Sequence, residues 1–393
     1  MGWNMGSDRM NELIRLKIPA KAAAADARIV RPGPFSPIMN LKPSITHLIC
    51  LLGLLVLPIQ AQYPAVANPP TPKKIISYGG GGWKDGQVNE PCILVNPKDA
   101  TKLIMFYSGM KLGGSAGALG KAWANVLEPF TWHEDANNPL LTNDPRIPFE
   151  ASGIRLDTVI YQEALNEYWI YYTGSSTKAQ ADAIGLATCP AGKDGYSEVV
   201  TANIKRHEAN PILSPKGQGR DDETFVSQGA VFREKGLWYS FYSYRTAKKV
   251  LPGIRLATSP DGKRWAKVSG PDILTAAPES VYMEWHQIYK IGDRYVMFYE
   301  GYNGGIRWGA NVATSSSLTT GWEKAPVDLI DQTRWPNYSD ETLFHVATPA
   351  IYQLKHKWYM YFTAAHSGYY INQHWALHGI ECDDVLAKIS MIP

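Results

Sequence analysis

Acidic, basic and imidazole side chains recur in this sequence at the start of five β-rich runs. Five residues before an apolar anchor in each run, the chain carries Glu90, Arg155, Ser227, Glu284 and Ala347. Within two residues of these positions stand Asp157, Gln228, His286 and His345. An acidic run, Arg220 to Thr224, precedes the third β-rich segment. Such a set suits general acid–base chemistry, because an arginine can hold one carboxylate ionised while burial raises the pKa of another.

The elements that must position these side chains repeat along the chain. Five runs end in paired aromatic residues, and their equivalent positions, roughly 57–70 residues apart as expected of a long structural repeat, are Tyr107, Tyr172, Tyr242, Tyr299 and Phe362. Each run follows another β-rich run across a short polar turn, which predicts a hairpin. The third repeat shows this with Gln228–Phe232, the turn Arg233–Gly236 and the run Leu237–Tyr242.

Two further strands are predicted in most repeats. One carries an Ala-Thr pair, as in Ile184–Thr188 and Ile254–Thr258, and the next carries a tryptophan, as at Trp132, Trp265 and Trp322. Hairpin, third strand and Trp strand together make four antiparallel strands. The sequence therefore predicts an all-β fold, a five-bladed β-propeller of four-stranded antiparallel blades. A β-sandwich or two smaller β domains remain the alternatives.

A secretory signal is predicted ahead of the repeats. Residues 39–61 give a short basic region, an apolar stretch at Leu48–Leu57 and a small-residue exit at Ala61. The apolar stretch is short for a membrane span, so no stable span is expected after cleavage, with a membrane-anchored or re-entrant segment as the alternative. Residues 1–38 are then an extension upstream of the start, 62–74 a Pro-rich lead-in, and 75–388 the propeller. The predicted location is secreted or periplasmic.

Composition excludes several kinds of partner and cofactor. The formal net charge is +3 and no Lys/Arg run is long, which argues against nucleic acid. Outside the signal, three cysteines at wide spacing (Cys92, Cys189 and Cys382) make neither a disulfide framework nor a zinc site. The Gly79–Gly82 run lacks the Lys-Ser/Thr of a phosphate loop. We therefore expect no required cofactor and no catalytic metal, with a structural divalent cation or a water on the propeller axis.

Residues 75–380 resemble the five-bladed propeller glycoside hydrolases, the group that includes families 43, 32, 117 and 130. The resemblance is carried by the hairpin repeat, the inner-strand carboxylates and the phrases Ala209–Leu213 and Thr258–Trp265. It implies that Glu90-Pro91 stands where family 43 has the Asp-Pro of its base. The segment Glu284–Lys290 has the form of the strand that holds the family's acid, although on the fourth blade.

The family 117 layout, with groups from blades one, three and four and a proposed His acid, fits this sequence better. By that resemblance the predicted catalytic residues are Glu90, Asp222, Glu284 and His286. The predicted substrate-binding residues are Asp157, Arg155, Arg220, Gln228, Trp285 and His345. The chain departs from family 43 because Arg155 and Ser227 stand where its relatives carry carboxylates, and the family 32 Asn-Asp-Pro-Asn motif is absent.

These residues predict a hydrolase of glycosidic bonds, exo-acting on a plant or algal oligo- or polysaccharide. Glu90 is the expected base, and Glu284 or His286 the expected acid, because residues that alternate along a strand face one side. Arg155 and Arg220 are expected to bind a carboxylate or sulfate of an acidic sugar. Several alternatives stay open. Asp157 can form a structural salt bridge, Asp222 a solvated charge, and the whole chain an inactive carbohydrate-binding β-propeller.

Overall fold

The computed structural model describes residues 71–111, 117–176, 182–247, 250–276, 282–302, 308–325, 343–355, 357–366 and 374–382. The predicted extension at 1–38, the predicted signal at 39–61 and residues 62–70 of the lead-in lie outside these ranges. The described residues form β-strands and three short 3₁₀ helices, which are η1 (Pro148–Glu150), η2 (Glu163–Leu165) and η3 (Thr201–Asn203). No helix among them is long and apolar enough to cross a membrane.

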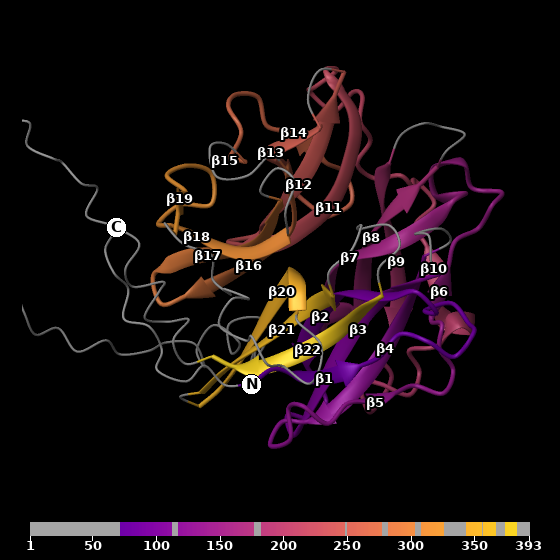
Figure 1. Ribbon diagram of the computed structural model, residues 1–393. Coiled ribbons are helices and arrows are strands. Elements are labelled where there is room, and N and C mark those ends of the chain that lie inside the picture. Colours follow the sequence, from indigo (N-terminus) through magenta and orange to yellow (C-terminus); the bar gives the residue numbers. More distant parts are fainter. Residues whose placement is uncertain are drawn as a thin grey trace, which may run out of the picture. The chain divides into compact units, whose positions relative to one another are not determined.

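The predicted hairpins are present in all five repeats, and each continues into antiparallel sheet (Figure 1). The first repeat contains β2 (Gln87–Val95), β3 (Lys102–Met110), β4 (Ala118–Asn125), β5 (His133–Glu134) and β6 (Leu141–Thr142). The second contains β7 (Gly153–Gln162), β8 (Glu167–Ser175), β9 (Ala183–Pro190) and β10 (Lys205–Arg206). The third contains β11 (Glu223–Glu234), β12 (Leu237–Thr246), β13 (Val250–Ser259), β14 (Ala266–Lys267) and β15 (Leu274–Thr275).

The last two repeats differ in how they are completed. The fourth contains β16 (Tyr282–Ile291), β17 (Arg294–Tyr302), β18 (Trp308–Ser315) and β19 (Glu323–Lys324). The fifth contains β20 (Leu343–Leu354), β21 (Lys357–His366) and β22 (Trp375–Glu381). Its outer strand is β1 (Lys73–Ile76), from the other end of the fold, which pairs antiparallel with β22. The first and last repeats therefore join into one nine-stranded sheet, through parallel pairing of Gln87 with Trp375.

The hydrophobic core lies between neighbouring sheets. The paired aromatics of each second strand supply it, because side chains of alternate residues project from opposite faces of a strand. Trp169 of β8 stacks on Trp238 of β12 with ring centroids 5.4 Å apart. Tyr107 of β3 packs in one cluster with Tyr359 and Tyr361 of β21, across the junction of the first and last repeats. Burying each such side chain stabilises the fold by about 1.5–3 kcal/mol.

The first strands of the repeats contact one another in chain order. Strand β7 contacts β2 and β11, β16 contacts β11 and β20, and β20 contacts β2. Their residues are therefore brought together although they are far apart in sequence. This is the arrangement that places the polar side chains described next in one region.

Candidate active site

Each first strand carries a β-bulge at a corresponding point. The pairing register shifts in β2 after Asn89, in β7 after Leu156, in β11 after Ser227, in β16 after Glu284 and in β20 after Ala347. Four bulge residues other than glycine have positive φ angles, which are Glu90 (60°), Gln228 (52°), Trp285 (31°) and Thr348 (48°). Such conformations are costly for these residue types, and bulges and strained residues cluster at functional sites.

The bulge backbone of each first strand is tied to the preceding sheet by a side chain. The N–H of Leu156 donates to Ser108 Oγ at 2.7 Å, and the N–H of Gln228 donates to Thr173 Oγ1 at 2.7 Å. In the same way, the N–H of Trp285 donates to Gln228 Oε1 at 3.2 Å, and the N–H of Thr348 donates to Glu300 Oε2 at 2.9 Å. The N–H of Glu90 donates to Thr348 Oγ1 at 3.4 Å. The bulges are therefore fixed by a continuous set of polar contacts, and their side chains are held in place.

Glu90 is buried within this set, 3% exposed. Ser108 Oγ donates to Glu90 Oε2 at 2.5 Å, so that Ser108 links the carboxylate to the backbone of Leu156. Burial raises the pKa of Glu90 above its ordinary value of 4.5, and the positive charge of Arg155 and a hydrogen bond from Gln228 oppose this rise. A buried carboxyl beside one guanidinium and three polar donors can serve as a base once ionised.

Asp157 lies on the neighbouring strand β7 and is equally buried. Thr173 Oγ1 donates to Asp157 Oδ1 at 2.7 Å, which repeats the contact between Ser108 and Glu90 one sheet further on. Burial raises the pKa of Asp157 to about 8, and the negative charge of Glu90 adds to the rise. The alternative of a structural salt bridge to Arg155 is not what the contacts show, because Arg155 Nη2 pairs with Asp182 Oδ2 at 3.3 Å.

Glu284 of β16 completes the group, together with a residue that the sequence did not single out. Glu284 is paired across the strand with Glu300 of β17, and both are buried. Burial raises the pKa of Glu284 to about 7; Arg155 lowers it, while the negative charges of Glu90 and Asp182 raise it further. Burial and the charge of Glu284 raise the pKa of Glu300 well above its ordinary value.

These four carboxyl groups, Glu90, Asp157, Glu284 and Glu300, are called the axial cluster below. Their charges act on one another and on Arg155. Arg155 acts on all four groups and Arg245 acts on Glu284, but burial and mutual repulsion disfavour ionisation of all four together, so we expect the cluster to retain protons at neutral pH. A protonated carboxyl and an ionised one held in one place are the acid and base that general acid–base catalysis needs.

The sequence alignment of the first strands is wrong by one residue in the first repeat. Strand pairing shows that Asn89, not Glu90, corresponds to Arg155 and Glu284, since Asn89 pairs with Ser108 as Glu284 pairs with Glu300. The anchor of the first repeat is accordingly Leu94 and not Val95. Glu90 reaches the cluster because it lies in the bulge next to Asn89.

The expectation that Glu284 and His286 face one side is also wrong. The bulge at Trp285 inserts one residue, so Glu284 pairs with Glu300 and His286 with the adjacent Tyr299. Adjacent partners project from opposite faces of β17. His286 Nε2 instead bonds the carbonyl oxygen of Phe241 at 2.5 Å, and burial lowers the pKa of His286 to about 4. A neutral imidazole bonded to the backbone does not favour His286 as the acid.

Two other predicted residues lie outside the axial cluster. The carboxylate of Asp222 is half exposed and pairs with Arg255 Nη2 at 2.9 Å, within an ionic group that includes Glu223 and Asp272. Arg220 donates to the carbonyl oxygens of Val268 and Gly270. The acidic run that contains Asp222 is therefore engaged in the third sheet, and Arg220 does not join Arg155.

The remaining predicted residues lie on the first strands. Gln228 is buried, donates to Glu90 and accepts from the N–H of Trp285. Trp285 is 1% exposed, and His345 on β20 is buried beside Trp375, with ring centroids 5.6 Å apart. Among the described residues, no group of three or more His, Cys, Asp or Glu is arranged to hold a metal ion. An axial cation stays a prediction.

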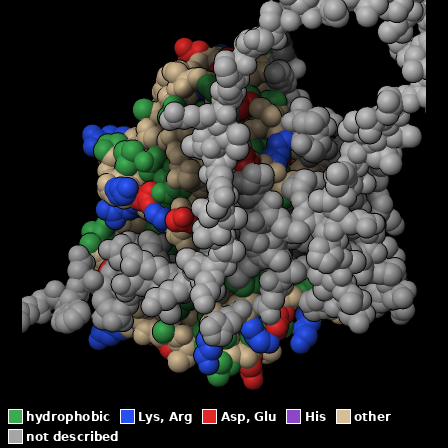
Figure 2. Space-filling model, turned by 90° about the vertical axis from the view of Figure 1, so that its left-hand side faces the viewer, with side chains coloured by type: hydrophobic (Ala, Val, Ile, Leu, Met, Phe, Trp, Pro, Cys, Tyr) green, Lys and Arg blue, Asp and Glu red, His purple; other side chains and the backbone are tan. Residues whose placement is uncertain are grey.

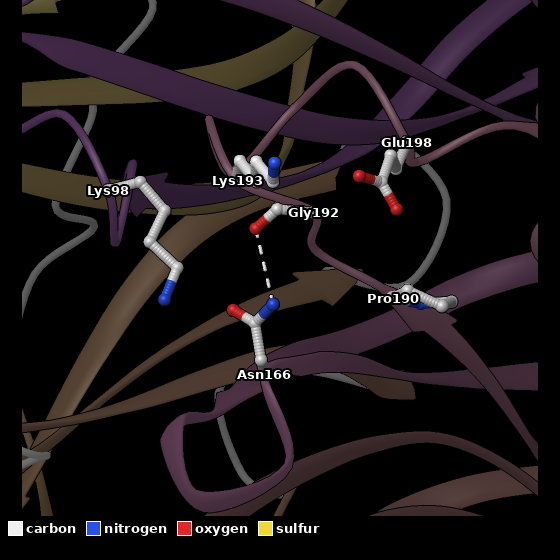
Figure 3. Close-up of a pocket in the computed structure, with 6 residues that line it drawn as sticks. All are labelled: Lys98, Asn166, Pro190, Gly192, Lys193 and Glu198. Carbon is white, nitrogen blue, oxygen red and sulfur yellow. Dashed lines mark hydrogen bonds between the residues drawn. The ribbon is translucent and has the colours of Figure 1, made fainter.

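A pocket of about 400 Å³ lies elsewhere, at the hairpin turns of the first two repeats (Figure 3). Its lining residues are Lys98, Asn166, Pro190, Gly192, Lys193 and Glu198, and Asn166 Nδ2 donates to the carbonyl oxygen of Gly192 at 3.2 Å. It is open to solvent and offers one carboxylate without a second one opposite. We therefore place the candidate active site at the axial cluster. On the described part of the face in Figure 2, acidic and basic side chains are interspersed.

Comparisons with known proteins identify the fold. No family model and no curated protein matches the sequence. Among solved structures, one described as "Glycoside hydrolase" matches with a TM-score of 0.57 and 17% identity, over 79% of this chain and 92% of that one. The catalytic domain of a family GH62 α-L-arabinofuranosidase from Coprinopsis cinerea matches with a TM-score of 0.55 and 10% identity, over 80% and 96%.

A family GH32 β-fructofuranosidase from Bombyx mori also matches, with a TM-score of 0.53 and 16% identity, over 78% of this chain and 61% of that one. The chain thus has the all-β fold that these glycoside hydrolases share. The resemblance to the propeller glycoside hydrolases, predicted from the hairpin repeat, is confirmed at the level of the fold.

Proposed function

We propose that this chain is a five-bladed β-propeller and a glycoside hydrolase whose active site is the axial cluster. The blade count is supported by the five hairpins, the contacts between successive first strands and the use of β1 to complete the fifth repeat. The single observation that carries the proposed activity is the axial cluster, in which carboxyl groups at and beside the bulges are buried and have raised pKa values. It lies in a fold that is shared with several glycoside hydrolases.

In the proposed mechanism, Glu90 is the base and Glu284 the acid. Ionised Glu90 removes a proton from the water that attacks the anomeric carbon. Protonated Glu284 gives its proton to the glycosidic oxygen as that bond breaks. Arg155 favours the ionised form of both groups, and hydrogen bonds from Ser108, Gln228 and the backbone of Leu156 favour ionised Glu90 further, whereas burial raises the pKa of Glu284 to about 7. Carboxyl groups about 6.5–9.5 Å apart would give inversion, and a gap of about 5 Å would give retention.

We further propose that the enzyme is secreted and removes sugars from the end of a plant or algal oligosaccharide. The secretion rests on the signal pattern at residues 39–61. Two of the matching structures are an arabinofuranosidase and a fructofuranosidase, so arabinofuranosides and fructofuranosides belong in the first substrate panel. The expectation of an acidic sugar now rests on Arg155 alone, which Asp182 already engages.

The test is product release from this panel by the wild type, Glu90→Gln and Glu284→Gln. Loss of about 10²-fold or more in both variants is expected, because each change removes one proton-transfer group. Glu128→Gln is the matched control, since Glu128 is exposed in the turn before β5. Full activity in either cluster variant would reassign that role. A fluorogenic leaving group separates the roles, because an activated aglycone needs little help from the acid and should spare Glu284→Gln selectively.

A carbohydrate-binding propeller without catalysis is the second candidate, and Gln228 favours it. At the third bulge this amide stands where the first strand of the first repeat presents Glu90, since each follows the last residue paired before its bulge. An amide cannot take a proton from water, which is the role proposed for the carboxylate of Glu90. Binding of an oligosaccharide with no release from any member of the panel would establish this candidate.

A further inference from the structure

The pair formed by Glu284 and Glu300 is unusual because two acidic side chains stand directly opposite each other in a buried position. They are cross-strand partners in β16 and β17, and their side chains project from one face. Glu284 is 6% exposed and Glu300 is 4% exposed. Like charges at such a position destabilise a sheet, so the pair is most stable when it holds a proton.

Among the described residues, the charged groups around the pair do not cancel a second negative charge. The ionised groups that act on Glu284 are Arg155 from β7, Glu90 from β2, Asp182 next to β9 and Arg245 from β12. Those that act on Glu300 are Glu284, Glu90 and Arg155. On β20, the N–H of Thr348 donates to Glu300 Oε2 at 2.9 Å, and the strand also carries His345. Both arginines also act on Asp182, so in the described part of the chain these two cations are shared among Glu284, Glu300, Glu90 and Asp182.

Glu300 is also connected to the proposed base. Thr348 accepts the N–H of Glu90 through Oγ1 at 3.4 Å, while its own N–H binds Glu300. One residue therefore fixes both Glu300 and the backbone at Glu90. This contact orients the Glu300 carboxyl beside its cross-strand partner Glu284.

We infer that Glu300 is the positioning residue of the site, and that it shares one proton with Glu284 and keeps that proton available to the leaving group through neutral pH. This inference rests on the proposed function, in which Glu284 is the acid. It assigns a role to a second-strand residue that acts through Glu284. No atom is gained or lost by the pair over a turnover, because the proton given to the leaving group is recovered from solvent by way of the base.

The first test is the pH profile of kcat/KM for the wild type, Glu300→Gln and Glu300→Asp. Without the like charge, Glu284 loses its proton at lower pH, so the alkaline limb of Glu300→Gln should move down by on the order of one pH unit. The acid limb, which reports the base, should stay in place. Glu300→Asp should recover part of the shift, and Glu128→Gln should match the wild type. An equal loss at every pH, or an unmoved alkaline limb, would overturn the inference.

The second test needs no activity. Denaturant unfolding is measured from pH 4.5 to pH 8 for the same variants. Protons held by the folded pair are released on unfolding in this range, so wild-type stability should fall as pH rises, and Glu300→Gln should fall less steeply. If the stability of Glu300→Gln falls less steeply with pH but the wild type hydrolyses no substrate, the shared proton is supported and the proposed function is rejected. A slope equal to that of the wild type would reject the shared proton even in an active enzyme.

Discussion

Two regions of this fold hold hydrogen-bonded carboxylates, and they compensate the negative charge to different degrees. Outside the axial cluster, three carboxylates each accept a hydrogen bond from a tyrosine hydroxyl of a second strand and from at least one lysine or arginine side chain. These groups are Glu134 with Tyr107 and Lys84, Glu150 with Tyr172 and Arg206, and Glu223 with Tyr242, Arg255 and Lys267. Each of these carboxylates, called the outer groups below, therefore has a positively charged side chain within hydrogen-bond distance.

The axial cluster uses the same residue types without that balance. Glu90 and Asp157 accept hydroxyl hydrogen bonds from Ser108 and Thr173, which are neutral donors. Arg155 is the shared guanidinium, and Asp182 already engages it. The outer groups therefore serve stability, whereas the axial groups retain mobile protons at a cost in stability. The two sites contain the same acidic residue types and differ in the number of cations that pair with them. We use this difference to distinguish a structural site from a candidate catalytic one.

The largest effect on stability is expected at Glu223. Its carboxylate is fully buried and binds Arg255 Nη1 and Lys267 Nζ, each at 2.7 Å. Glu223→Gln leaves both cations with less compensation, so the free energy of unfolding should fall by about 3–5 kcal/mol. Urea unfolding measures it, and activity per folded molecule should be kept.

The matched control for Glu223 is Glu134→Gln. Glu134 has the same kind of partners, but its side chain is 35% exposed and screened by solvent. Glu134→Gln should lower the free energy of unfolding by less than about 1 kcal/mol. Equal costs at the two sites would show that burial does not set the strength of the outer groups.

The second effect is a pH dependence of opposite sign in the two regions. Folding raises the pKa of Glu284 from 4.5 to about 7, so the folded protein binds the extra proton between these values. Its contribution is present below pH 4.5 and lost as pH rises to 7, on the order of 3 kcal/mol. Glu284→Gln should remove this loss in unfolding curves measured at pH 5 and pH 7.5.

The ion pair of Asp135 with Lys121, with Oδ2 and Nζ 3.1 Å apart and next in sequence to Glu134, should respond in the other direction. Burial raises the pKa of Asp135, but hydrogen bonds from the N–H of Asn137 and from Lys121, together with the positive charge of Lys121, lower it to below 3.8. Its contribution is present above pH 3.8 and lost as pH falls. Asp135→Asn should therefore weaken the acid-side loss of stability and leave the alkaline side unchanged. A variant that flattened both sides would mean that the two regions are electrostatically linked.

The sequence predicts the hairpins because their signals are local. Aromatic runs such as Trp238–Ser243 and the turns before them specify pairing within some ten residues, and the structure has these hairpins. The completion of the fifth repeat by β1 could not be predicted, because it joins Lys73 to Gly379 and carries no motif. Such long-range pairings depend on the closure of the whole fold.

The axial cluster was predicted in part. Glu90 and Glu284 were found from their places on the first strands, and Asp157 from its neighbourhood to Arg155. The sequence pattern does not single out Glu300, because the second strands have the pattern of aromatic core strands, although the acid at Glu300 replaces the Ser or Thr found at Ser108 and Thr173. That single exchange was the available signal. The bulge at Trp285, which places His286 on the opposite face from Glu284, cannot be recognised from the hydrophobic pattern of the sequence.

The smallest effect is expected at Asp222, the predicted residue that the structure assigns to the outer region. Its side chain is 51% exposed, and a hydrogen bond from Arg255 lowers its pKa. Because solvent screens this pair and Glu223 still engages Arg255, Asp222→Asn should cost less than about 1 kcal/mol. Its kcat/KM should stay within roughly twofold of the wild type, well under the tenfold that corresponds to 1.4 kcal/mol. A loss of activity without a loss of stability would return Asp222 to the catalytic site and remove the distinction between the two regions.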